Sequence, residues 1–105
     1  GRPVGVRAQL PQVIRNAQFK VRLEPVSTDL FDQPRQVQLS LEKAEEPVVP
    51  PLSCVVGPGG SVTVDVFLSM GCGLEPGDRV RWVLRDAVTE EVLAEQEAVS
   101  QIDLW

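Results

Sequence analysis

Phe19-Lys20-Val21-Arg22-Leu23 is the stretch that decides the fold, because its apolar and charged residues alternate strictly. Successive side chains of a β-strand point to opposite faces, so this pattern buries the three apolar residues and exposes the two cations between them. Pro25 ends the run, since proline has no N–H to donate to a strand ladder. The stretch therefore predicts a half-buried strand of an antiparallel sheet.

The same period of two recurs along the rest of the chain. Apolar and polar residues also alternate around residues 4–10, 37–41, 62–68, 80–84 and 92–99. Turn signals such as Pro76-Gly77 separate these runs. A further strand through Leu52 and Cys54 follows two prolines, so we expect it at a sheet edge or beginning only after Pro51. Six to seven short strands predict an all-β fold, namely a single-domain antiparallel β-sandwich or a partly open barrel.

The alternation also assigns faces to the aromatic side chains. In the segment 62–68 the valines face one way and Phe67 faces the other. Trp82 lies on an alternating strand, where a large aromatic side chain usually anchors the core of a sandwich. An antibody-type core places a tryptophan between two cysteines, whereas Trp82 follows both Cys54 and Cys72. A true antibody-like domain is therefore disfavoured.

Length, composition and charge limit the classes of function. The 105 residues suit one domain spanning residues 1–105, with an ordinary hydrophobic fraction of 43%. No apolar run approaches the ~18 residues that a membrane-spanning helix needs. The net charge of −5 and the scattered Lys and Arg residues leave no basic field for phosphates. Nucleic acid is therefore not an expected partner.

Two cysteines, Cys54 and Cys72, each lie close to a glycine- or proline-rich corner. An even number of cysteines in a small acidic domain favours a disulfide between them. The alternative is a pair of free buried thiols in a reducing compartment. A two-cysteine metal site is the weakest reading, because the chain has no His to complete the coordination.

No catalytic apparatus or cofactor site is recognisable in the sequence. The absence of His removes the commonest general base and the commonest zinc ligand, so we expect no metal centre and no enzyme activity. The glutamates between Glu90 and Glu97 are expected on a solvated strand face. Loops could offer calcium ligands at Asp29, Asp32, Asp65, Asp78 and Asp86, but these residues lack the dense spacing of a calcium loop. The glycine-rich residues 57–60 predict a turn, since no Lys-Ser/Thr follows them.

What remains is surface for recognising another protein. Sheet edges can accept a peptide as an extra strand, and a cleft between sheets can accept an amphipathic helix. Leu30 and Phe31 lie in a loop, where they either plug the core or form a contact patch. Trp105 either staples the last strand to the body or projects as a contact residue. Leu30, Phe31 and Trp105 are therefore the candidate partner-binding residues.

Two segments carry a resemblance to a known family. Val4-Gly5-Val6-Arg7, continuing through Leu10-Pro11 to the strand at residues 19–23, resembles the opening of small bacterial outer-membrane lipoproteins of the YscW and YbaY kind. Residues 74–82, which begin Leu-Glu-Pro-Gly-Asp, are similar to their closing hairpin. With its two cysteines, the chain is most similar to the secretin pilot lipoproteins, or pilotins, of type III secretion systems.

The resemblance implies a non-catalytic domain on the periplasmic side of the outer membrane. Such a protein is anchored by lipids on an N-terminal cysteine, which would precede Gly1. It binds the C-terminal segment of a secretin and assists the localisation and assembly of that secretin. The alternative reading is an extracellular β-sandwich module, of the adhesion or receptor type, that binds another protein.

Overall fold

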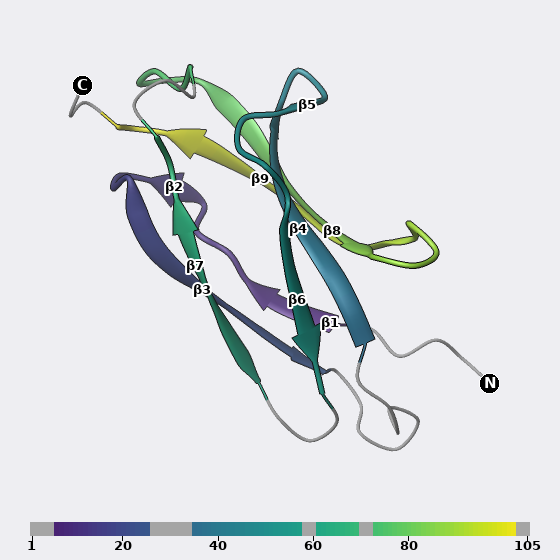
Figure 1. Cartoon of the computed structure of the whole chain (residues 1–105). Coiled ribbons are helices and arrows are strands. Elements are labelled where there is room, and N and C mark those ends of the chain that lie inside the picture. Colours follow the sequence, from purple (N-terminus) through teal and green to yellow (C-terminus); the bar gives the residue numbers. More distant parts are fainter. Residues whose placement is uncertain (1–5, 26–34, 58–60, 70–72, 103–105) are drawn as a thin grey trace.

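Two β-sheets face each other in the computed structural model of the chain (Figure 1). The structure describes residues 6–25, 35–57, 61–69 and 73–102, and nine strands lie in these ranges. They are β1 (Val6–Gln9), β2 (Val13–Ile14), β3 (Gln18–Pro25), β4 (Arg35–Lys43), β5 (Glu46–Pro47), β6 (Leu52–Val56), β7 (Val62–Phe67), β8 (Arg79–Asp86) and β9 (Val92–Ser100). These ranges contain no helix, and hence none long and apolar enough to cross a membrane. The predicted all-β class is confirmed.

The two sheets have open edges, so the molecule is a sandwich rather than a closed barrel. Sheet A has the order β1-β3-β7, and both of its pairings are antiparallel. Sheet B has the order β2-β9-β8-β4, with β5 and β6 both paired to the far edge of β4. Its one parallel pairing joins β2 to β9. The strand β6 begins directly after Pro51 and lies at a sheet edge, as the prolines predict.

The order of the seven longer strands is that of immunoglobulin-like sandwiches. The first, second and fifth of them form one sheet, and the third, fourth, sixth and seventh form the other. The tryptophan of this core lies on β8, which follows both cysteines in the sequence. Antibody domains place a tryptophan between two cysteines, and this sequence does not. Other sandwiches share the strand order without that spacing.

The core fills the space between the two sheets. Trp82 is only 1% exposed, and its ring meets that of Phe19 edge to face with 5.8 Å between the centroids and 87° between the planes. Trp82 therefore joins β8 of sheet B to β3 of sheet A, which confirms its predicted core role. Leu68 is buried and Phe67 is 67% exposed, so the predicted faces of that segment are also confirmed.

Two short strands, β2 and β5, account for the difference between the predicted six to seven strands and the nine described. The strand β5 returns from β4 through Ala44 and Glu45, which have positive φ values of 53° and 69°. Two consecutive residues in the left-handed region make the tight turn of a β-hairpin, which usually contains Asn or Gly. Ala-Glu carries no such signal, so the sequence did not predict this hairpin.

Candidate functional site

A crossover between the two sheets, formed by Leu10 and Pro11, borders one of the grooves of the molecule. The chain leaves sheet A after β1 and enters sheet B at β2. Side chains of sheet B hold both crossover carbonyls: Gln96 Nε2 donates to the Leu10 oxygen at 2.7 Å, and Trp82 Nε1 donates to the Pro11 oxygen at 3.1 Å. The crossover is therefore fixed in place by hydrogen bonds from two strands distant in the sequence.

Beyond the crossover, part of β3 has no neighbouring strand on one side among the residues that the structure describes. The register of β1 on β3 ends at Gln9↔Arg22, and extending it would place Pro11 opposite Lys20. Proline has no N–H for that position, so the pairing stops there. The Leu68 N–H donates to the Ala17 oxygen at 2.7 Å, so the backbone groups of Ala17 point toward the β7 side. Residues that face the neighbouring strand alternate with residues that face away along an antiparallel pair. The backbone groups of Gln18 and Lys20, one and three positions after Ala17, therefore point away from β7.

A groove of about 410 Å³, which we call the β2–β3 groove, lies where β1 has left the sheet. Ile14 is 1% exposed, Phe19 and Leu10 are half-buried, and Val13 is 37% exposed. These apolar side chains give the groove a hydrophobic floor. The lining comprises Gln9, Leu10, Pro11, Val13, Ile14, Arg15, Asn16, Phe19 and Lys20.

The charge of the β2–β3 groove is opposite to that of the whole chain. Its lining contains two cations, Arg15 and Lys20, and no Asp or Glu, although the net charge of the chain is −5. Lys20 Nζ lies 3.8 Å from Asp65 Oδ1, but the two side chains are 73% and 71% exposed, so this ion pair is weak. In the described part of the chain, no carboxylate lies within salt-bridge distance of Arg15. The lining of the groove thus carries a net positive charge beside an apolar floor.

A second and larger groove, of about 480 Å³, lies at the other side of sheet B, and we call it the β4–β9 groove. Its lining comprises Gln12, Glu42, Ala44, Glu45, Arg79, Val80, Arg81, Glu97, Ala98 and Val99. Arg81 Nη2 lies 3.7 Å from Glu97 Oε1, and Glu42 Oε2 accepts a hydrogen bond from Arg85 Nη1 at 3.0 Å. The lining thus mixes three glutamates with two arginines, so this groove presents charges of both signs to a partner.

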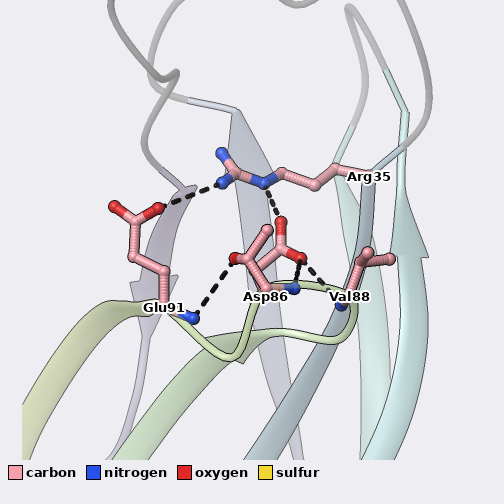
Figure 2. A network of polar contacts seen from close by, with 5 residues as sticks. Arg35, Asp86, Val88 and Glu91 are labelled. Carbon is pink, nitrogen blue, oxygen red and sulfur yellow. Dashed lines mark hydrogen bonds and ion pairs between the residues drawn. The ribbon is translucent and has the colours of Figure 1, made fainter.

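A largely buried polar network holds the turn between β8 and β9 (Figure 2). Asp86 Oδ2 accepts from Arg35 Nε at 2.7 Å, and Asp86 Oδ1 accepts from the N–H groups of Val88 and Thr89 at 2.8 and 2.9 Å. Glu91 lies 4.0 Å from Arg35 at the edge of the network. The bond from the Thr89 N–H, followed by that from Arg35, lowers the pKa of Asp86 to about 2.

An Asp86 carboxyl with so low a pKa stays ionised at neutral pH and cannot donate a proton as a general acid. All three of its hydrogen bonds shape the turn rather than face a cavity. Asp78 pairs with Lys43 at 2.8 Å, which lowers the pKa of Asp78, whereas the exposed Asp65 lies 3.8 Å from Lys20. Of the five aspartates considered as calcium ligands, Asp65, Asp78 and Asp86 are thus held at three separate places, and Asp29 and Asp32 lie outside the described residues.

Cys54 is a free thiol in the structure, so the predicted disulfide with Cys72 is not seen. The side chain is half-buried on β6, opposite Val37, where it packs against the core. Burial raises the pKa of the Cys54 thiol, which makes it a poor nucleophile at neutral pH. Cys72 lies outside the described residues.

The residues predicted to bind a partner, Leu30, Phe31 and Trp105, also lie outside the described residues. The sequence did not predict the β2–β3 groove, because its lining comes from the end of β1, the crossover, β2 and the start of β3. No local pattern shows that these segments lie together. One signal was present: Pro11 follows an alternating run and marks the point where pairing stops.

Comparisons with known proteins give no assignment. No protein-family model matches the chain, and no curated protein matches it in sequence. The geometry of the molecule therefore has to carry the functional argument.

Proposed function

We propose that this domain is a non-catalytic protein-binding module, and that its β2–β3 groove receives a segment of the partner. The supporting observation is the lining of that groove, where Arg15 and Lys20 stand above an apolar floor with no acidic residue among them. An apolar floor supplies affinity by burial, and uncompensated charge at a rim selects the partner and its orientation. The β4–β9 groove lacks this asymmetry.

The resemblance of residues 4–23 and 74–82 to secretin pilot lipoproteins suggests a first partner. On this proposal the domain works at the outer membrane on the periplasmic side, where a lipid anchor in the full-length protein holds it. It binds the C-terminal segment of a secretin and assists the localisation and assembly of that secretin in type III secretion.

A second candidate function rests on a different observation. The strand order of the two sheets is that of immunoglobulin-like sandwiches, which many cell-surface domains share. An extracellular adhesion or receptor module built on this fold would also bind another protein. Fold alone does not choose between these functions, because one fold hosts many of them.

Titration of the domain with secretin C-terminal peptides, followed by calorimetry and by the amide spectrum of the labelled protein, tests the proposal. We expect a peptide to bind at micromolar concentration and to shift the amide signals of residues 13–20. Val13→Glu, which places an acid at the groove, should weaken binding at least about tenfold, equivalent to about 1.4 kcal/mol. Val88→Glu is the matched control, since Val88 is 79% exposed at the distant β8–β9 turn.

Three outcomes decide between the candidates. Binding that responds to Val13→Glu and not to Val88→Glu supports the groove as the binding site. Equal loss of binding in both variants contradicts the groove. If no secretin peptide binds at micromolar concentration, the pilot function is rejected and the adhesion or receptor module becomes the candidate to pursue.

A further inference from the structure

We propose that the partner segment binds as an added β-strand on the open edge of β3, and that it alternates acidic with apolar residues. This inference rests on the proposed function, because it specifies how a protein segment occupies the β2–β3 groove. Its basis is the juxtaposition, within the described residues, of a strand edge without a partner strand, an apolar floor and two exposed cations in a lining that holds no acidic residue.

The open edge offers the backbone groups that a new strand needs. Gln18 and Lys20 direct their N–H and C=O groups away from β7, and β1 has already left the sheet at this level. No backbone partner for Gln18 or Lys20 is found on that side among the residues that the structure describes. A strand that continues the path of β1 would run antiparallel to β3 and pair with both residues.

The side chains of β3 set the pattern of the added strand. Lys20 is exposed on the outer face of sheet A, whereas Phe19 points inward and packs against Trp82. Residues directly opposite each other on neighbouring strands share a face. The partner residue opposite Lys20 therefore lies on the outer face, where a carboxylate meets the ammonium group. The next partner residue points inward over the floor formed by Ile14 and Phe19, where an apolar side chain fits.

Arg15 favours a second acidic residue in the partner segment. It lies on the β2 side of the groove, is exposed, and has no carboxylate within salt-bridge distance in the described ranges. A second acidic residue of the partner can therefore be neutralised by a guanidinium that has no competing intramolecular ion pair.

The other open edge of sheet A fits such a segment less well. On β7 the residues whose backbone groups point away from β3 are Thr63, Asp65 and Phe67. An acidic residue added opposite Asp65 would meet a like charge, which disfavours pairing. Neither groove has a lining residue on β7.

The probes are two capped nine-residue peptides, one alternating Glu with Val and the other alternating Lys with Val. We expect the Glu peptide to bind the full chain at least about tenfold more tightly than the Lys peptide in low salt, a preference that added salt reduces. The double variant Arg15→Glu/Lys20→Glu should reverse this preference. The matched control Arg79→Glu/Arg81→Glu makes the same charge change at the β4–β9 groove and should leave the preference in place.

Backbone pairing has its own readout. We expect the Glu peptide to slow hydrogen exchange at the amides of Gln18 and Lys20 and to leave those of Thr63 and Asp65 unchanged. A Glu peptide whose alternate backbone nitrogens are methylated cannot donate to β3, and one of its two possible methylation patterns should lose binding at least about tenfold.

The outcomes separate this inference from the proposed function. Secretin peptides that bind at the groove without any preference for acidic residues, or without protecting Gln18 and Lys20, overturn the added strand and leave the groove as a binding site. Binding of the Glu peptide that appears only after residues 103–105 are removed shows that the chain's own end occupies the groove, which also overturns it. If neither secretin tails nor the Glu peptide bind, both proposals fall.

Discussion

At the β8–β9 turn, the carboxylate of Asp86 accepts hydrogen bonds from Arg35, Val88 and Thr89. In the β2–β3 groove, by contrast, Arg15 and Lys20 flank an apolar floor with no acid in the lining, and no described strand pairs with Gln18 and Lys20 of β3 on that side. Polar groups that are satisfied within the chain contribute to stability. Exposed cations and backbone groups without a partner strand add little to folding, and we propose that they serve recognition.

The largest loss of stability should come from Asp86→Ala, which removes the carboxylate that accepts the hydrogen bonds at the β8–β9 turn. The change removes a buried carboxylate oxygen that lies 2.7 Å from Nε of Arg35, whose side chain is 18% exposed. We expect a loss of about 2–3 kcal/mol in the free energy of unfolding, measured by urea denaturation at constant slope. Glu91→Ala is the control, because that side chain is 52% exposed and should cost less than about 0.5 kcal/mol.

Binding of a groove ligand to the folded Asp86→Ala protein should be unchanged. If Asp86→Ala lowered the affinity for the groove ligand as well as the stability, the β8–β9 turn and the β2–β3 groove would not be independent.

Acid should produce the next largest effect. The pKa of Asp86 is about 2 in the folded state, below its ordinary value of 3.8, so its ionised form stabilises the fold. This contribution is fully present above about pH 4 and is lost as the pH falls through about 2. We expect it to amount to about 1–2 kcal/mol, read as the difference in acid stability between the wild type and Asp86→Asn. Parallel acid curves for the two proteins would contradict this assignment.

Trp82→Phe tests the hydrogen bond that holds the Leu10–Pro11 crossover beside the β2–β3 groove. Phenylalanine keeps an aromatic ring beside Phe19 but cannot donate to the Pro11 oxygen, which Trp82 Nε1 reaches at 3.1 Å. We expect a loss of about 1–2 kcal/mol in stability, together with faster hydrogen exchange at the amides of Gln12 and Val13. Val83→Ala, on the opposite face of β8, is the control: it should also cost stability without affecting exchange at the crossover. Equal acceleration in both variants would show that the Trp82 hydrogen bond does not hold the crossover.

The smallest change in stability should come from the groove cations. Arg15→Gln and Arg81→Gln each remove one exposed positive charge, and each should alter the free energy of unfolding by less than about 0.5 kcal/mol. Only Arg15→Gln should weaken binding of the acidic alternating peptide, since Arg15 lines the β2–β3 groove and Arg81 does not. A large destabilisation by Arg15→Gln would place this residue among the groups that hold the fold.

The strands of the core were predictable because alternation is a local property. The alternation within residues 19–23 predicts which side chains are buried without information from the rest of the chain. Val21 and Leu23 are buried as predicted. The hairpin at Ala44 and Glu45 was not predictable, because neither residue type signals a positive φ. The Cys54–Cys72 disulfide was inferred from cysteine number alone, and Cys54 is a free thiol.

By itself the sequence determined the all-β class, the inward faces of the strands and the core position of Trp82, since each follows from a period of two residues. Only the tertiary structure decided where β3 loses its neighbour. The crossover at Leu10 and Pro11 is held by Gln96 and Trp82, which are 86 and 71 positions away in the sequence. The groove exists because hydrogen bonds from sheet B fix the path of a segment that leaves sheet A, and no local pattern encodes a contact between such distant residues.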